Sequence, residues 1–215
     1  MINAAIAFTG ADLALVTSYN ASRPQDPNYW TDPATDGIRS RIKRHYATQQ
    51  AFRCCYCNRE LLTRHGRVWD CEHVVPRSTH PQFLFHPINL VVSCVDCNNI
   101  KSNQQTLVRP RRVTLPTTSA DYLIIHAHFD AFDDHLAILF GRFYLAKTDK
   151  GAATIITCGL LRYSYELLGW NELVATLGST ESFFQQLMDA TTEQERQLAK
   201  LQLLAICQLT ALRPP

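Results

Sequence analysis

Two pairs of cysteines in the sequence have the spacing of a metal site. Cys54 and Cys57 form one C-x-x-C motif, Cys94 and Cys97 form a second, and 36 residues separate the two motifs. Each C-x-x-C turn can direct both sulfurs at one point, so four thiolates can close a tetrahedral zinc site. A thiol redox pair is the alternative. Cys55 is not expected to be a ligand, because a pair with Cys57 would need an unusual C-x-C turn. Cys71, Cys158 and Cys207 have no partner at ligand spacing and are predicted to be small buried side chains.

An acidic residue stands directly before a histidine between these motifs, in the stretch WDCEHVVPRS at residues 69–78. With INLVVSCVDCNNIKSN at residues 88–103, this stretch resembles the HNH endonuclease superfamily. The shared pattern is an acidic-His-x-x-Pro strand, an Asn-Leu turn, a C-x-x-C motif and an Asn-x-x-Lys helix, and it covers about residues 52–104. The resemblance implies an α+β protein with a ββα-metal nuclease core and a structural zinc knuckle. Glu72 stands where the family most often has aspartate.

The resemblance also implies a role for each matching residue. His73 corresponds to the general base, and Glu72 and Asn98 correspond to the ligands of a catalytic divalent ion. Asn89 corresponds to the residue that holds the loop between the two strands, and Lys101 lies at the position of the family's helix lysine.

These residue types also suit phosphodiester hydrolysis on chemical grounds. The reaction needs a base for water and a cation for the charge on phosphorus. A neutral imidazole suits the first task, and the oxygen ligands Glu72 and Asn98 suit Mg²⁺ or Mn²⁺. Asp70 shares a strand face with Glu72 and is a further candidate ligand, or a group that supports the ligands. Spacing alone does not bring Glu72 and His73 to one phosphate, because adjacent strand residues point to opposite faces.

Positive charge is concentrated in the middle of the chain. Residues 39–112 hold thirteen Lys or Arg against four Asp or Glu, whereas the net charge of the whole chain is +2. Such a segment is typical of a polyanion-binding surface. In GIRSRIKRHYATQQ, apolar residues recur every fourth position, which predicts an amphipathic helix whose basic face is either solvated or contacts phosphate. The residues expected to bind nucleic acid are Lys101, Arg77, Arg41 and Arg44, with Arg77 either contacting phosphate or solvated.

Three segments are expected along the chain. Residues 1–37 are predicted to be rich in loops, residues 38–112 to form the nuclease core, and residues 113–215 to form a mixed, largely helical α/β extension that binds a partner. Within the extension we predict strands over 121–145 and helices over 152–168 and 181–212. Thr192 and Glu195 have the spacing of a capping box. The apolar last helix is either buried or a subunit interface.

The extension contains the stretch HAHFDAFDDH, with three histidines that either bind a metal or form hydrogen bonds in a packed turn. These are His126, His128 and His135. HFDAFDDH and the later KTDKGAATIITCGLLR are similar to the C-terminal region of HNH effector subunits in Septu-type and retron-linked anti-phage systems. This looser resemblance implies a role in bacterial defence with an ABC-type ATPase subunit as partner.

Composition limits the class of protein. The 215 residues are 46% hydrophobic and 19% charged, which is typical of a globular protein. The chain begins without the basic residues of a signal peptide and has no run long enough for a membrane span, so we expect a cytoplasmic protein with reduced cysteines. We therefore expect a metal-dependent endonuclease that hydrolyses DNA. The alternatives are a zinc-ribbon nucleic-acid binder without cleavage activity and a subunit that is silent without its ATPase. RNA or tRNA remains open as the substrate.

Overall fold

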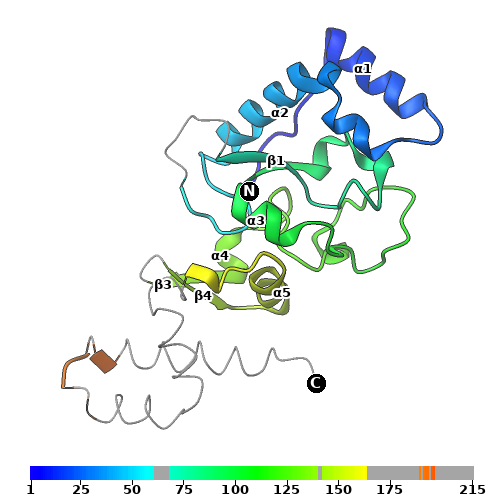
Figure 1. Cartoon of the computed structure of the whole chain (residues 1–215). Helices are drawn as coiled ribbons and strands as arrows, with labels where there is room; N and C mark the ends of the chain where they lie inside the picture. The colour runs from blue at the N-terminus through cyan, green and yellow to red at the C-terminus, as the bar shows by residue number, and fades with distance from the viewer. Residues whose placement is uncertain (61–67, 140–141, 164–188, 190, 194, 197–215) are drawn as a thin grey trace. The chain divides into compact units, whose positions relative to one another are not determined.

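The computed structural model describes residues 1–60, 68–139, 142–163, 189, 191–193 and 195–196 of the chain (Figure 1). The described part is α+β and contains two two-stranded sheets. Its longer helices and its strands are α1 (Gly10–Ala21), α2 (Asp36–Gln49), β1 (Trp69–His73), β2 (Leu90–Cys94), α3 (Val95–Lys101), α4 (Phe132–His135), β3 (Leu136–Leu139), β4 (Phe143–Ala146) and α5 (Asp149–Thr157). Among the described residues, no helix has the length and apolarity needed to cross a bilayer.

The chain divides into two compact units. The first comprises residues 1–136 and 146–160, and the second comprises residues 137–145 and 161–215. The cysteine pairs, the basic helix and the strand with Glu72 and His73 all lie in the first unit. In the described part of the second unit, β4 carries Tyr144, whose ring lies 5.6 Å from that of Tyr163.

The amphipathic helix predicted in the basic segment is present as α2. Ile38, Ile42 and Tyr46 recur at four-residue spacing, and each is at most 1% exposed. This apolar stripe packs on both strands of the β1–β2 pair, because a helix with one apolar face must bury it against another element (Figure 1). The opposite faces of α2 are left to its arginines and lysine.

The β1–β2 pair is antiparallel, with Glu72 opposite Val91 and His73 opposite Leu90. All five residues of β2 are buried, so this strand forms the centre of the core. Helix α3 follows β2 directly and packs against both strands. The order strand, strand, helix thus places the second cysteine pair, Asn98 and Lys101 beside β1.

Residues 1–37 contain a helix that the sequence did not predict. Helix α1 has Asp12 in its first turn, and the carboxylate of Asp12 pairs with the Arg41 guanidinium on α2. The ion pair raises the pKa of Arg41. Two short 3-10 turns, Pro27–Thr31 and Pro33–Thr35, then lead into α2.

The strands predicted over 121–145 are found only as β3 and β4, and the prediction is wrong for residues 121–135. Ser119–Asp121 is a 3-10 turn, and residues 126–130 form a turn in which the backbone N–H of Asp130 donates to the carbonyl of His126 at 2.9 Å. The Asp130 side chain also accepts from the backbone N–H of His126 at 2.8 Å. The segment buries aromatic and β-branched side chains without forming a strand ladder, so its composition alone led to the wrong prediction of a strand.

The helix predicted over 152–168 begins as α5, and residues 164–168 of that prediction lie outside the described residues. Helix α5 begins after Thr148, whose side chain accepts from the N–H of Gly151, and it ends at Thr157. Gly159 then adopts φ +59°, a left-handed conformation that stops a helix. The helix predicted over 181–212 lies largely outside the described residues. Its capping box is confirmed, because Thr192 N–H donates to Glu195 Oε2 at 3.0 Å and Glu195 N–H donates to Thr192 Oγ1 at 3.2 Å.

Candidate active site and cysteine cluster

The four paired cysteines form one buried cluster, which we call the cysteine cluster. The sulfurs of Cys54, Cys57, Cys94 and Cys97 all lie within 4.8 Å of one another. A tetrahedral zinc with 2.3 Å bonds requires sulfurs about 3.8 Å apart, and Cys57 Sγ lies 4.0 Å from Cys94 Sγ. The cluster could therefore hold a structural metal such as zinc. Among the described residues, it is the one group of three or more His, Cys, Asp or Glu side chains placed closely enough to hold a metal ion.

Backbone donors support this reading of the cluster. The N–H of Cys94 donates to Cys54 Sγ at 3.3 Å, and the N–H of Cys97 donates to Cys94 Sγ at 3.4 Å. Such bonds stabilise thiolates and fix the sulfurs in place. The first turn is also anchored on the core strand, because the Cys55 N–H donates to the Val92 carbonyl at 3.1 Å.

The other described cysteines are buried or half-buried. Cys55 and Cys158 are buried, and burial raises the pKa of both thiols. Cys71 is half-buried, and burial raises its pKa to about 12. All three thiols stay protonated at neutral pH, as expected for packing residues rather than metal ligands. Cys207 lies outside the described residues.

A cleft of about 1320 Å³ opens along β1, and we call it the β1 cleft. Its lining includes six residues predicted from the sequence to act in the site: Asp70, Glu72, His73, Arg77, Asn98 and Arg44. Further basic residues of α2 line it, as does Trp30 from the segment before α2. Although Glu72 and His73 are adjacent in a strand, both reach this one cleft. Lys101, Arg41 and Asn89 do not line it.

Glu72 is held by two donors on the same oxygen. Lys101 Nζ lies 2.6 Å from Glu72 Oε1, and the Tyr56 hydroxyl donates to that oxygen at 3.0 Å. Lys101 Nζ also donates to the His73 carbonyl at 3.0 Å. Burial raises the pKa of Glu72, and the ammonium of Lys101 opposes that rise. Because both donors contact Oε1, Oε2 is the oxygen that Glu72 can offer to the cleft.

Lys101 is only 1% exposed, so its ammonium is not available to a phosphate at the surface. The prediction that Lys101 contacts nucleic acid therefore needs correction. The lysine neutralises a buried carboxylate, and a buried charge without such a partner would be strongly destabilising. From α3, the Lys101 side chain extends toward β1, where its ammonium contacts Glu72 and the His73 carbonyl, and not toward solvent.

His73 is held in one orientation by the backbone. Its Nε2 lies 3.0 Å from the Leu84 carbonyl, which can only accept, so Nε2 carries the proton of the neutral ring. Nδ1 is then the basic nitrogen. The ring packs edge-on against Trp30 with centroids 4.4 Å apart. Burial lowers the pKa of His73 to about 3, so the ring is neutral at neutral pH.

Asp70 and Asn98 are paired across the hairpin and α3. Asn98 Nδ2 donates to Asp70 Oδ2 at 2.8 Å. The side-chain oxygen Oδ1 of Asn98 and the second carboxylate oxygen of Asp70 can then act as ligands of a cation. With Glu72, these groups bring three oxygen-bearing side chains to one cleft. Oxygen donors of this kind suit Mg²⁺ or Mn²⁺ rather than the metals that thiolates prefer.

Asn89 joins the two ends of the loop between the strands. Its Oδ1 accepts from the Val75 N–H at 2.7 Å, and its Nδ2 donates to the carbonyls of Val75 and Phe83 at 3.1 and 3.2 Å. The side chain is fully buried, so each of these bonds replaces one that water would otherwise make. The loop that follows His73 is thereby tied to the start of β2.

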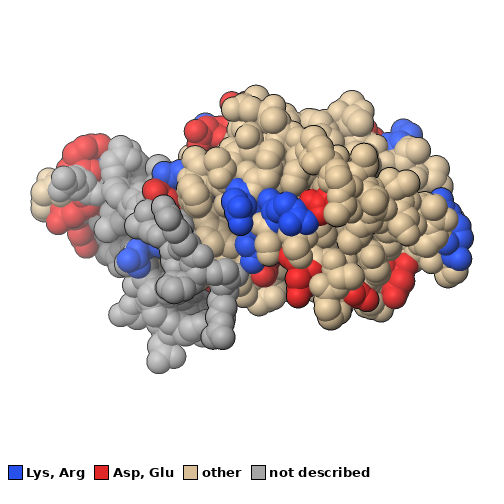
Figure 2. Space-filling model, turned by 90° about the horizontal axis from the view of Figure 1, so that it is seen from above, with Lys and Arg blue, Asp and Glu red and all other residues tan. Residues whose placement is uncertain are grey.

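The remaining predicted cations lie in different surroundings. Arg77 lines the β1 cleft and donates to the Pro27 carbonyl, whereas exposed Arg44 lines the cleft from α2. Arg41 is engaged by Asp12 instead. Arg39 and Lys43, one helical turn apart on α2, complete the basic wall, in which Arg39 pairs with Asp36. Lys and Arg side chains gather on the face shown in Figure 2, beside acidic side chains.

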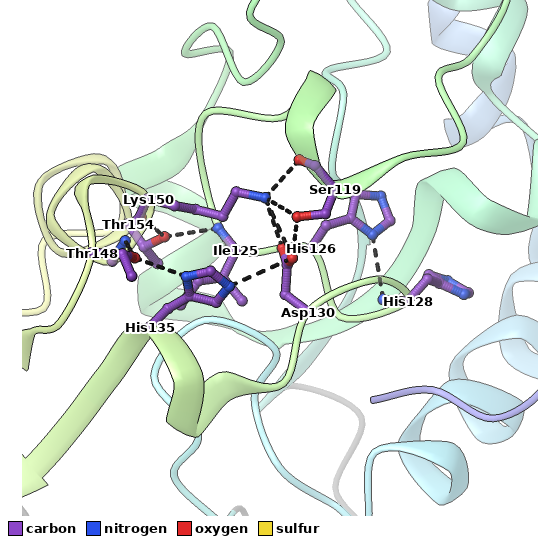
Figure 3. A network of polar contacts seen from close by, with 10 residues as sticks. Ser119, Ile125, His126, His128, Asp130, His135, Thr148, Lys150 and Thr154 are labelled. Carbon is purple, nitrogen blue, oxygen red and sulfur yellow. Dashed lines mark hydrogen bonds and ion pairs between the residues drawn. The ribbon is translucent and has the colours of Figure 1, made fainter.

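The histidine-rich stretch of residues 126–135 forms a polar network rather than a group of three ligands (Figure 3). Its centre is buried Asp130, which pairs with Lys150 Nζ at 3.1 Å and lies 3.6 Å from His135 Nε2. The backbone N–H of His128 donates to His126 Nδ1 at 3.3 Å, and the buried His126 ring packs against aromatic rings. His128 Nε2 contacts the Leu90 carbonyl at 3.0 Å. The network joins the turn to α5.

The sequence did not predict the residues that contact Glu72 and His73 from the first cysteine turn and from the segment before α2. Tyr56 lies between two cysteines of the cluster, and no pattern marks a tyrosine hydroxyl as a partner of Glu72, which is 16 residues away. Trp30 comes from the loop-rich segment and contacts His73 across 43 positions of sequence. The only feature of the sequence that could have drawn attention to Trp30 is its position as an aromatic residue in a segment rich in Pro, Asn and Asp.

No protein-family model matches the chain, and no curated protein matches it. We therefore infer function from the side chains of the β1 cleft and of the cysteine cluster.

Proposed function

We propose that the chain is a metal-dependent endonuclease of the HNH type that hydrolyses DNA. One observation carries the proposal. A neutral imidazole with a fixed tautomer and three oxygen-bearing side chains line a single cleft, and the wall of that cleft is basic. Phosphodiester hydrolysis needs a base, a cation site and a surface for a polyanion, and the β1 cleft has a candidate for each.

In the proposed reaction, His73 Nδ1 accepts the proton of the attacking water. The Leu84 carbonyl holds the ring by Nε2 and favours the protonated ring as it forms. Asp70, Glu72 and Asn98 would hold a Mg²⁺ or Mn²⁺ ion, which would stabilise the negative charge that develops at the phosphate. Arg39, Lys43 and Arg44 would bind the phosphates beside the scissile one. By resemblance to the family, the leaving group is the 3′ oxygen, which gives 5′-phosphate ends.

We propose zinc for the cysteine cluster, because four thiolates suit zinc and the sulfur distances are close to those of a tetrahedral site. A role as the nuclease of a bacterial anti-phage system with an ABC-type ATPase partner is the wider proposal. The alternative function is a zinc-ribbon nucleic-acid binder that cleaves nothing.

Cleavage distinguishes the two functions. We expect the purified chain, incubated with supercoiled plasmid, to produce nicked or linear DNA with Mg²⁺ or Mn²⁺ and none without a divalent ion. Single- and double-stranded DNA and RNA should be tested in parallel. A chain that binds these nucleic acids but cleaves none of them, alone or with a partner ATPase, would support the alternative.

The hydroxyl of Tyr56 permits a test of the role given to Glu72. Without its hydrogen bond, the carboxylate can rotate so that both oxygens pair with Lys101, and Oε2 is drawn away from the cleft. We expect Tyr56→Phe to weaken Mn²⁺ binding and to raise the Mn²⁺ requirement for cleavage by roughly 10- to 100-fold, the usual effect of losing a group that orients a ligand. Calorimetric titration with Mn²⁺ measures the first effect independently of activity.

Tyr122→Phe is the matched control for this experiment. Tyr122 is also almost fully buried, but its hydroxyl donates to the Pro116 carbonyl at 2.7 Å and not to Glu72. The two variants should retain the same zinc content. If Tyr56→Phe binds Mn²⁺ as tightly as Tyr122→Phe does, the hydrogen bond to Glu72 has no role in the cation site.

A further inference from the structure

Phe52 is an exposed aromatic side chain at the edge of the β1 cleft. Its side chain lies just beyond the end of α2, it is 45% exposed, and it lines the cleft together with Arg44 and Asn98. A large apolar ring in this position loses the stabilisation that burial would provide. The proposed hydrolysis assigns no task to the ring.

The backbone around Phe52 is held in conformations that side chains rarely adopt. Ala51 has φ +48° and Phe52 has φ +56°, both in the left-handed region. Ser102, which also lines the cleft, has φ +46° and ψ −125°. For a bulky residue such as phenylalanine this conformation is an outlier, and residues of this kind gather at ligand-binding sites.

The position of Phe52 is fixed by its neighbours. Its N–H donates to the Ala47 carbonyl at 2.8 Å, which closes the end of α2. The Gln50 side chain bridges to β2, donating to the Val92 carbonyl and accepting from the Val92 N–H, both at 2.8 Å. Gln50 Nε2 also donates to the Arg53 carbonyl at 2.8 Å. The ring is therefore presented on a preorganised turn rather than on a free loop.

A basic face leads along α2 to this ring. Arg39 and Lys43 are four residues apart, as are Ser40 and Arg44, and all four line the cleft. On a helix this spacing forms a continuous stripe, and the stripe ends at the turn that carries Phe52. Recognition of single-stranded nucleic acid uses two components, a row of cations along the phosphate backbone and an exposed aromatic ring on which a base can stack. The α2 face and Phe52 provide both.

We propose that Phe52 is a stacking platform for an unpaired base, so that the substrate is a nucleic-acid strand with at least one unstacked base beside the scissile phosphate. The inference rests on the proposed function, because it assigns the substrate class of the same cleft. A base pair inside a duplex has both faces covered by its neighbours, so the ring can stack only on a base that is single-stranded or extruded. DNA and RNA offer the same aromatic face, and binding to each distinguishes them.

Phe52→Leu and Phe52→Trp form a matched pair for the test. Both replacements keep an apolar side chain without β-branching in the left-handed conformation, but only tryptophan keeps a stacking face. Binding of the full chain is measured by fluorescence anisotropy, without Mg²⁺ or Mn²⁺, to single-stranded DNA, single-stranded RNA and blunt duplex DNA of one sequence. We expect Phe52→Leu to weaken single-strand binding by about 5- to 150-fold, to change duplex binding less than twofold, and Phe52→Trp to bind as wild type does.

An abasic site adds a second criterion. One abasic position in the single strand should reproduce the loss caused by Phe52→Leu, and Phe52→Leu should not respond to it. Equal losses on duplex and single strand, an unchanged Phe52→Leu variant, or a Phe52→Trp variant as weak as Phe52→Leu would each overturn the inference. Single-strand binding that depends on Phe52, without any cleavage, would contradict the proposed nuclease function but support the stacking role of Phe52. Cleavage by a Phe52→Leu variant that binds like wild type would support the nuclease function but contradict the stacking role.

Discussion

Cys57→Ala is expected to abolish both zinc binding and cooperative unfolding of the first unit. Structural zinc contributes roughly 10–16 kcal/mol of apparent binding free energy, which is as large as the whole stability of a typical domain, about 5–15 kcal/mol. The cluster connects the first cysteine turn, the end of β2 and the start of α3. Zinc content by mass spectrometry and thermal unfolding by circular dichroism measure the two effects.

Cys55→Ala provides the control, because Cys55 is also buried and lies in the same turn but is not part of the cluster. Loss of its thiol should cost about 1–2 kcal/mol through packing alone, with one zinc retained. A Cys57→Ala protein that melts like Cys55→Ala would show that the cluster does not hold a folding metal. A wild-type protein without zinc would show the same.

Short-range patterns in the sequence predicted the elements that position the site. The four-residue recurrence of Ile38, Ile42 and Tyr46 predicts α2, because only a helix places such residues on one face. The two C-x-x-C motifs predict the cysteine cluster, because the turn geometry of each pair is local. Thr192 and Glu195 predict their capping box for the same reason. In each case a few neighbouring residues determine the local geometry, whereas the meeting of the two cysteine pairs depends on the fold of the residues between them.

Contacts between distant segments could not be predicted in this way. Lys101 has the sequence context of a surface cation, and only the packing of α3 under β1 shows that it neutralises Glu72. Residues 121–135 have the composition of a strand, yet they contain a turn in which the Asp130 carboxylate accepts a hydrogen bond from the His126 N–H. The hydroxyl of Tyr56 reaches Glu72, and the ring of Trp30 reaches His73, through tertiary contacts that cannot be predicted from a single sequence.

His73→Ala is expected to lower the cleavage rate by roughly 10²- to 10⁴-fold, the usual contribution of a positioned base. The substitution removes the nitrogen proposed to accept the proton of water but leaves the cysteine cluster and the proposed oxygen ligands unchanged. Nucleic-acid binding should therefore persist. Raising Mg²⁺ or Mn²⁺ should not restore the rate, because proton removal is the missing step. Single-turnover cleavage and a binding assay on the same preparation measure the two quantities.

His80→Ala separates catalysis from packing in this experiment. His80 is buried to the same extent as His73, at 6% exposure, and its Nε2 also contacts a backbone carbonyl, that of Pro110, at 2.8 Å. It does not line the β1 cleft, so its loss should reduce stability without reducing the rate. His73→Gln covers the case in which alanine destabilises the fold, because the glutamine amide can still donate to Leu84 but has no basic nitrogen. If His73→Gln, in a preparation free of contaminating nuclease, cleaves at the rate of His80→Ala, then His73 is not the base, and the function of the cleft must be assigned to other side chains.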